Sequence, residues 1–127
     1  MKIVIIEDEQ ITAEDLADLI IRLQPNAQIV ASLRSVKESL HYFRMHGMPD
    51  LIFSDIQLGD GLSFDIFKAV EVTAPIIFCT AYDEYAFNAF RTTGIDYILK
   101  PIVSSTVEQA LKKYQTLRKE FTTSAVS

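Results

Sequence analysis

The sequence of 127 residues predicts an α/β domain built as a three-layer sandwich, with a parallel sheet between two layers of helices. Short apolar runs rich in β-branched residues alternate with longer segments of helical period, the order expected for parallel strands joined by crossover helices. The apolar runs lack the polar alternation of a half-exposed strand, so a sheet covered on both faces is expected. The predicted strands are residues 3–6, 28–32, 51–54, 76–79 and 97–99.

Helices are expected between the strands, where apolar residues recur at three- and four-residue spacing. The first begins at a capping pair, Thr12 and Asp15, and is stopped by Pro25. The second starts at Ser35 and ends near Gly47, a residue type that is common just after helices. The predicted helices cover residues 12–23, 35–45, 63–71, 83–92 and 104–121.

Composition limits the class of protein. Hydrophobic residues make up 49% and charged residues 23% of the chain, the balance of a globular domain with a buried core. The net charge of −5 and the lack of a Lys/Arg run disfavour direct binding to a nucleic acid backbone. The apolar run after Lys2 is too short for a signal peptide or a membrane span, so a cytoplasmic location without membrane contact is expected. Residues 1–121 are expected to form the domain, and 122–127 a disordered tail or the start of a linker.

Residues suited to metal and phosphate chemistry follow four of the predicted strands. In an open α/β sheet, ligands bind at the carboxyl ends of the strands, so these residues are expected to converge on one rim. Carboxylates gathered there repel one another, and a hard divalent cation with oxygen ligands relieves the repulsion. Mg²⁺ is the natural candidate, held by Asp8 and Asp55, with Glu7 nearby and help from a backbone carbonyl.

Asp55 has the neighbours that a carboxylate nucleophile needs. A carboxylate can attack phosphorus and form an acyl phosphate if its charge is screened from the incoming oxygens. Mg²⁺ and the ammonium of Lys100 would supply that screening, while the Thr80 hydroxyl and the Ala81 backbone N–H can donate hydrogen bonds to the phosphoryl group. Each feature is common by itself, but their conjunction at four strand ends indicates phosphoryl transfer to Asp55.

Four fragments of the sequence resemble the receiver domains of bacterial two-component response regulators. They cover residues 4–9, 51–56, 78–82 and 96–101. The segment 80–86 more narrowly resembles receivers of the LytTR type, whose output domain binds DNA. The resemblance implies a flavodoxin-like (βα)5 fold with strand order 2-1-3-4-5, and a signalling domain rather than an enzyme. A LytTR output domain needs roughly another hundred residues, so DNA contact is expected only through a domain outside this sequence, and the chain is an excised or a stand-alone receiver.

Carried over by motif, the resemblance makes Asp55 the phosphoacceptor of a sensor histidine kinase, with Mg²⁺ as the cofactor. Gln57 would give a backbone carbonyl to the metal, and its side chain would tune the rate at which water removes the phosphoryl group. The loop 57–62 has two glycines where the family more often has a proline, which predicts a mobile loop. Lys100 precedes Pro101 at a junction that is cis in the family. The implied metal ligands are Glu7, Asp8, Asp55 and Gln57, and the implied phosphoryl contacts are Thr80 and Lys100.

The resemblance also predicts how phosphorylation is converted into a signal. Thr80 and Tyr97 occupy the two switch positions, where a hydroxyl drawn toward the phosphoryl group leaves room for an aromatic ring to turn inward. Such a change biases an equilibrium that already exists. The face formed by the fourth helix, the fifth strand and the fifth helix is expected to form a homodimer on phosphorylation, because it mixes aromatic residues with arginine. Its residues include Tyr85, Phe87, Asn88 and Arg91.

Two other functions use a similar set of residues. A hydrolase of the haloacid-dehalogenase type also has an aspartate nucleophile with Mg²⁺, but it needs a second acid two residues later, where this chain has Gln57. A pseudo-receiver would act through protein contacts alone, an alternative that the intact acidic, hydroxyl and lysine positions disfavour. Three further side chains have structural interpretations: a buried thiol at Cys79 and exposed imidazoles at His41 and His46.

Overall fold

A computed structural model of the chain describes the backbone of residues 1–126 and the side chains of residues 1–119. Its main sheet has five parallel strands in the order β2-β1-β3-β6-β7. When only these strands are counted, this is the predicted order 2-1-3-4-5. The strands are β1 (Lys2–Ile6), β2 (Gln28–Leu33), β3 (Leu51–Ser54), β6 (Ile76–Thr80) and β7 (Gly94–Leu99).

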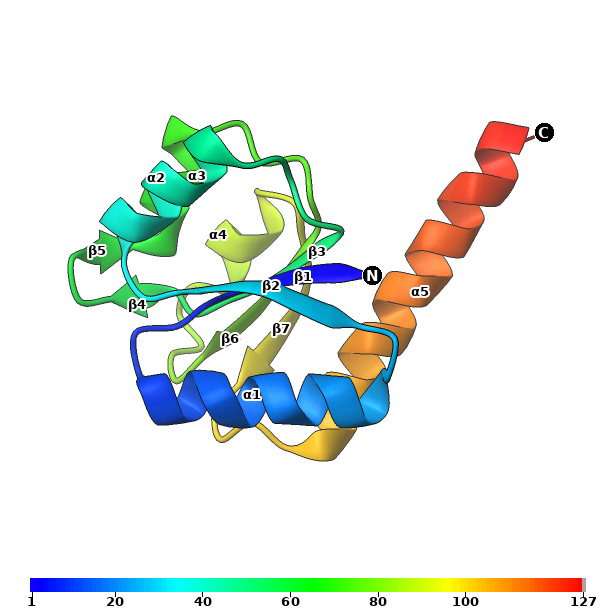
Figure 1. Cartoon of the computed structure of the whole chain (residues 1–127), viewed down its shortest axis with the longest axis horizontal. Coiled ribbons are helices and arrows are strands. Elements are labelled where there is room, and N and C mark those ends of the chain that lie inside the picture. The colour runs from blue at the N-terminus through cyan, green and yellow to red at the C-terminus, as the bar shows by residue number, and fades with distance from the viewer. Residues whose placement is uncertain (127) are drawn as a thin grey trace.

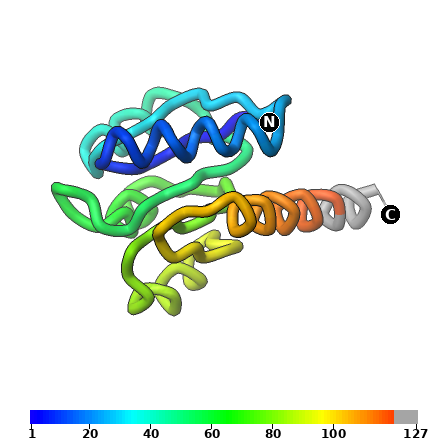
Figure 2. Tube along the Cα trace, turned by 90° about the horizontal axis from the view of Figure 1, so that it is seen from below, coloured from blue at the N-terminus to red at the C-terminus, as the bar shows by residue number. Residues whose placement is uncertain are grey.

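Helices cover both faces of the sheet, as predicted (Figure 1). Two helices, α1 (Gln10–Leu23) and α5 (Ser104–Val126), lie next to each other on one face, as the view in Figure 2 shows. The other face carries α2 (Val36–Met45), α3 (Ser63–Ala69) and α4 (Ala86–Phe90). The chain is therefore a three-layer sandwich.

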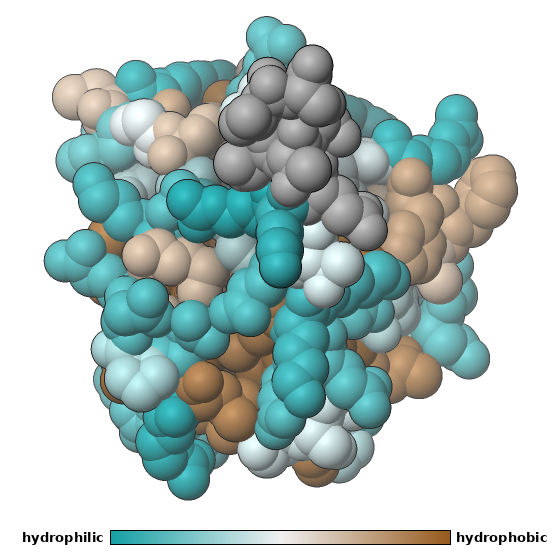
Figure 3. All heavy atoms as spheres, turned by 90° about the vertical axis from the view of Figure 1, so that its right-hand side faces the viewer, coloured by the Kyte–Doolittle hydropathy of each residue, from teal (hydrophilic) through white to brown (hydrophobic). Residues whose placement is uncertain are grey.

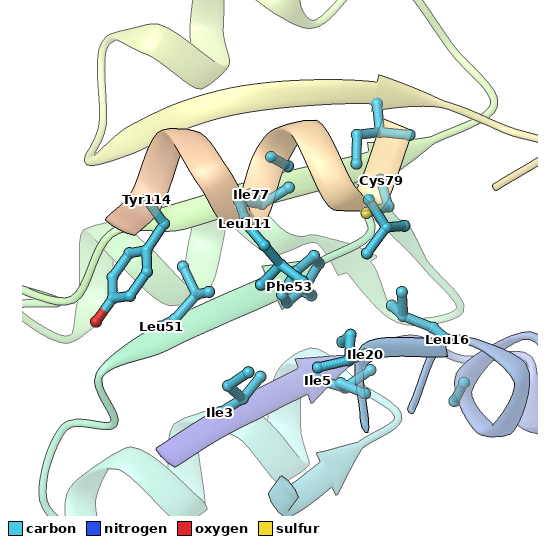
Figure 4. Close-up of a cluster of buried hydrophobic side chains, with 14 residues drawn as sticks. Ile3, Ile5, Leu16, Ile20, Leu51, Phe53, Ile77, Cys79, Leu111 and Tyr114 are labelled. Carbon is cyan, nitrogen blue, oxygen red and sulfur yellow. The ribbon is translucent and has the colours of Figure 1, made fainter. Parts of the chain in front are cut away.

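The sheet separates two buried clusters. Successive residues of β1 point to opposite faces, so Ile3 and Ile5 join the α1/α5 side while Val4 and Ile6 join the α2/α3/α4 side. In Figure 4 the first cluster is seen between the sheet and the two long helices. Its labelled members are Ile3, Ile5, Leu16, Ile20, Leu51, Phe53, Ile77, Cys79, Leu111 and Tyr114.

Two helix boundaries at the start of the chain test the predicted caps. α1 begins at Gln10, two residues before the predicted start, and its N-cap Glu9 makes no side-chain capping hydrogen bond. The predicted capping pair of Thr12 and Asp15 is therefore wrong, since both residues lie inside the helix. The start of α2 was predicted correctly, because the Ser35 side chain accepts a hydrogen bond from the Glu38 backbone N–H at 3.0 Å.

The fourth helix is much shorter than predicted, with five residues instead of the span 83–92. Tight turns close its end, since the backbone N–H groups of Arg91 and Thr92 donate to the carbonyls of Asn88 and Ala89. The chain then passes so close to the helix that a Cβ on Gly94 would lie 2.5 Å from the Ala89 carbonyl oxygen. A longer α4 would collide with the approach to β7.

Other elements differ from the prediction at their ends. β7 begins at Gly94 rather than at residue 97, and α3 ends at Ala69 rather than at 71. β2 is an edge strand whose residues alternate in exposure, so the expectation of full cover was wrong for this strand. α5 continues to Val126, so the predicted tail 122–127 begins within this helix; Ser127 lies outside the described residues.

The loop after β3 forms an antiparallel hairpin of β4 (Gln57–Leu58) and β5 (Gly61–Leu62), and its mobility stays a prediction. Gly61 has φ +151°, a conformation that side chains disfavour, and a Cβ there would lie 3.2 Å from Asp65 Oδ2. A glycine is therefore required at the end of this turn.

Two features concern the surface of the described chain. None of its helices combines the length and the apolar character needed to cross a membrane. Figure 3 shows the end of the molecule opposite the carboxyl ends of the strands, and that face is mostly hydrophilic with scattered hydrophobic residues. His41 and His46 are exposed and Cys79 is buried, as predicted, and burial raises the pKa of the Cys79 thiol.

Candidate functional site

The carboxyl ends of the parallel strands bring the predicted acids, hydroxyl and lysine to one rim, on the side where the β4–β5 hairpin lies (Figure 1). Backbone hydrogen bonds fix this edge: the Asp55 N–H donates to the Ile6 carbonyl and the Lys100 N–H to the Thr80 carbonyl, both at 2.8 Å. Glu7 follows directly after β1. Residues as far apart in sequence as Glu7 and Lys100 thus become neighbours.

Lys100 joins the two buried acids of the rim. Its Nζ lies 2.6 Å from Glu7 Oε1 and 2.9 Å from Asp55 Oδ2. Both carboxylates are almost completely buried, with 3% of Glu7 and 8% of Asp55 exposed. Burial of two like charges is costly without a cation, so the ammonium is the group that makes this arrangement stable in the described chain.

The acids of the rim outnumber its one lysine, and this excess shifts the pKa values of the side chains there. Burial raises the pKa of Glu7 to about 7, because hydrogen bonds from Lys100 and from the Glu9 backbone offset only part of the desolvation, and Asp8 and Asp55 add to the rise. Burial alone would lower the pKa of Lys100, but its hydrogen bonds and charge interactions with Glu7 and Asp55 raise it instead. Lys100 is therefore charged at neutral pH, and a further cation would favour the charged form of Glu7.

The donor set fits a hard divalent cation. Glu7, Asp8 and Asp55 each offer a carboxylate oxygen, and these oxygens lie within 4.8 Å of one another. Carboxylate oxygens are the ligands that Mg²⁺ prefers, and it commonly uses one or two of them together with water and phosphate oxygens. Three of the four predicted metal ligands are thus brought together by their side chains, and Gln57 lies two residues beyond Asp55 at the start of β4.

Thr80 and Asp55 accept hydrogen bonds from backbone N–H groups that follow them closely in the sequence. The Thr80 side chain is fully buried, and its Oγ1 accepts from the Tyr82 backbone N–H at 3.4 Å. Asp55 Oδ1 accepts from the Ile56 backbone N–H at 2.6 Å. Ala81, whose backbone was predicted to contact a phosphoryl group, is exposed beside them. The Lys100–Pro101 peptide bond is cis, as predicted.

Two tyrosine contacts extend the rim toward α4 and β7. Gln57 Nε2 donates to the Tyr85 hydroxyl at 2.8 Å, and the Tyr97 hydroxyl donates to the Tyr82 carbonyl. The rings of Tyr82 and Tyr85 pack edge to face with centroids 6.3 Å apart. Tyr82 therefore contacts both predicted switch residues, Thr80 through its N–H and Tyr97 through its carbonyl.

Sequence reasoning missed these contacts. Tyr85 was predicted only as part of an interaction face, and nothing in the local pattern indicates that its hydroxyl meets a side chain 28 residues earlier. Within the predicted face, Phe87 and Arg91 are exposed, and the Arg91 guanidinium lies 5.7 Å from the centre of the Phe87 ring. Phe90, the last residue of α4, is 52% exposed.

Comparisons with known proteins agree on one family. The profile of the response regulator receiver domain matches residues 3–112. The chain is 36% identical over 118 residues to a sensory transduction protein LytT of Bacillus cereus, covering 91% of this chain and 47% of that protein. It is 34% identical to a positive alginate biosynthesis regulatory protein of Pseudomonas aeruginosa, covering 89% and 46%. The chain thus spans about half the length of the curated relatives it matches.

A solved structure gives the same result for the fold. The response regulatory domain of protein mrkE from Klebsiella pneumoniae superposes with a TM-score of 0.79 at 34% identity, covering 94% of this chain and 99% of that one.

Proposed function

The chain belongs to the response regulator receiver domain family, and from that membership we propose that it accepts a phosphoryl group on Asp55 in a Mg²⁺-dependent reaction. The observation that carries the proposal is the buried contact of Lys100 with both Glu7 and Asp55 at the rim of the sheet. A carboxylate held next to an ammonium and two further acids has the surroundings of a nucleophile toward phosphorus.

The residues of the rim have complementary roles in that transfer. An oxygen of Asp55 forms the new bond to phosphorus, while the bond to the donor breaks and the leaving group keeps its electron pair. Glu7, Asp8, Asp55 and the Gln57 carbonyl would hold Mg²⁺, which supplies positive charge against the phosphoryl oxygens when bound. Lys100, whose Nζ contacts Asp55 Oδ2, would donate to the phosphoryl oxygens. The Thr80 hydroxyl and the Ala81 backbone N–H would be further donors to this group.

The proposed switch runs from Thr80 to Tyr97. A phosphoryl group that accepts a hydrogen bond from the Thr80 hydroxyl would draw Oγ1 away from the Tyr82 backbone N–H, which donates to this oxygen. Tyr82 also accepts the hydrogen bond of Tyr97, so movement of Tyr82 changes the position favoured by the Tyr97 ring. The hydrogen bonds of Tyr82 with Thr80 and with Tyr97 support this route. The exposed Phe87 and Arg91 lie on the adjoining face, which is proposed for homodimerisation.

The partners of this function follow from the family and from the relatives. A sensor histidine kinase is proposed as the phosphoryl donor, and the chain catalyses only its own phosphorylation and dephosphorylation. The receiver is proposed to comprise residues 1–121, with 122–127 leading toward a LytTR-type DNA-binding domain; the twofold greater length of the LytT relative supports this arrangement. Transcription would then be regulated through that domain rather than by this chain directly.

The test is intact mass spectrometry after incubation with Mg²⁺ and acetyl phosphate. A gain in mass equal to one phosphoryl group is expected for the wild type, with none for Asp55→Asn and none when Mg²⁺ is left out. Size-exclusion chromatography of the phosphorylated sample should show a dimer. A folded wild type that binds Mg²⁺ but gains no mass would contradict the proposal and leave a pseudo-receiver that acts through its surface.

A further inference from the structure

A carboxylate at the turn of the β4–β5 hairpin fastens the hairpin to α2. Asp60 Oδ1 accepts from the Val36 backbone N–H at 2.8 Å, and its Oδ2 accepts from the Lys37 N–H at 3.0 Å. Both donors lie in the first turn of α2, where backbone N–H groups have no partner inside the helix. One side chain thus joins two elements that are 23 and 24 residues apart in sequence.

α2 has a local cap as well, so Asp60 does more than cap the start of this helix. The Ser35 side chain accepts from the Glu38 N–H, the third donor of the first turn, while Asp60 takes the first two. A local cap would satisfy the helix without any contact to the hairpin. The additional contact therefore fixes where the hairpin lies relative to α2.

The hairpin turn lies close to two helices at Gly61. A Cβ on Gly61 would lie 3.2 Å from Asp65 Oδ2 and 3.5 Å from Val36 Cγ2, so the turn is close to both α2 and α3. The other end of the hairpin begins at Gln57, two residues after Asp55, and pairs with Leu62. Only Leu58 and Gly59 separate Asp60 from Gln57 in the sequence, so the position of the turn affects the position of Gln57.

We propose that Asp60 is a positioning residue of the phosphorylation site, which fixes the Gln57 backbone carbonyl by holding the hairpin turn against the start of α2. The proposal rests on the function proposed above, in which that carbonyl is a metal ligand. Groups that orient a ligand without touching the metal contribute strongly to metal affinity, because a preformed site has less conformational freedom to lose.

Three variants separate positioning from simple helix capping. Asp60→Ala removes both hydrogen bonds to α2, Asp60→Asn keeps one carbonyl oxygen as an acceptor, and Ser35→Ala removes the local cap without touching the hairpin. Each is measured for melting temperature, for Mg²⁺ affinity by calorimetry, and for amide hydrogen exchange of residues 57–62. Asp60→Asn also covers the case in which the alanine variant does not fold.

Asp60→Ala is expected to weaken Mg²⁺ binding about tenfold, the lower end of the loss caused by removing such supporting groups. It should also speed exchange in residues 57–62, and Asp60→Asn should lie between it and the wild type. Ser35→Ala is expected to lower the melting temperature by about 4 °C, as a lost cap does in a small domain, with unchanged Mg²⁺ affinity.

Asp60→Ala with a lowered melting temperature, but wild-type Mg²⁺ affinity and wild-type exchange, would overturn the inference and make Asp60 a cap alone. A wild type that binds no Mg²⁺ would instead refute the function proposed above. In that case the exchange of residues 57–62 still decides whether Asp60 anchors the hairpin, because this measurement needs no metal.

Discussion

The two faces of the sheet are covered in different ways. On one face α1 and α5 have 14 and 23 residues, and both contribute buried side chains to the cluster of Figure 4. On the other face α2, α3 and α4 have 10, 7 and 5 residues. The two clusters have similar numbers of buried residues, but α2, α3 and α4 contribute fewer of them than α1 and α5 do. Short helices open at a lower cost in free energy, so we expect the α2/α3/α4 face to be the more adaptable side.

The polar contacts of the proposed switch follow this division. Tyr85 and Tyr97 pack against the cluster on the α2/α3/α4 side, and Gln57 and Asp60 lie in the hairpin next to it. Hydrogen bonds of Gln57 with Tyr85 and of Asp60 with α2 join the hairpin to the neighbouring segments there. Such contacts can be exchanged at small cost, which is a property that a switching face requires.

The largest expected effect concerns the α1/α5 face. Ile20→Ala removes a fully buried side chain of α1 and should lower the free energy of unfolding by about 2–5 kcal/mol, because a cavity remains in the cluster. Phe87→Ala, on α4 and 74% exposed, should change it by less than about 0.5 kcal/mol. Urea denaturation measures both. Similar losses in the two variants would contradict the burial of Ile20 in the α1/α5 cluster and the exposure of Phe87 on α4.

An intermediate effect is expected at the rim where the two faces meet. Lys100→Met leaves Glu7 and Asp55 without their ammonium and should cost about 2 kcal/mol, less than for a fully buried pair because part of the site is solvated. Mg²⁺ should restore part of this stability, measured by urea denaturation with and without the ion. Lys112→Met is the control, since its ion pair with Glu108 is exposed and worth less than about 0.5 kcal/mol. Equal losses in the two variants would show that the contacts of Lys100 at the rim stabilise the fold no more than an exposed ion pair does.

The smallest effect concerns the pH dependence of the adaptable face. Hydrogen bonds from the Val36 and Lys37 backbones lower the pKa of Asp60 in the folded chain. Asp60 therefore stabilises the fold above the unfolded-state pKa of about 4, and this contribution is lost as the pH falls through the lower folded-state value. The charged residues on the contacting segments are Lys37, Glu38 and Asp65.

The measurement is the difference in melting temperature between wild type and Asp60→Ala from pH 7 to pH 2.5. The difference should be constant above about pH 5 and shrink below about pH 4, while the other titrations cancel because both proteins share them. A difference that grows as the pH falls would contradict the assigned direction.

Much of the fold and most of the site could be predicted because both depend on local patterns. Apolar runs such as residues 51–54 identify strands whichever elements cover them, and the parallel order brings the ends of those strands together. The acidic residues after β1 and β3 and the lysine after β7 were therefore expected at one rim, and the structure places Glu7, Asp55 and Lys100 in direct contact there.

The features that were predicted wrongly are those in which packing outweighs the local pattern. The helical period of residues 83–92 is real, but the approach of Gly94 to the Ala89 carbonyl stops α4 at its C-terminal end, and the helix has five residues. The hairpin of residues 57–62, whose turn brings Asp60 to α2, was not predicted from the local pattern. A local pattern does not reveal which distant segment will restrict it.

The sequence by itself therefore determined the strands and the residue types at their ends, because periodicity and residue type act over a few positions, while the strand order followed from the family resemblance. Only the tertiary structure decided which groups hold that rim in place: Tyr85 with Gln57, Tyr82 with Tyr97, and Asp60 with α2. These contacts join side chains or backbone groups that are 28, 15 and 24 residues apart. Their formation depends on how whole elements pack, and no short stretch of sequence encodes that.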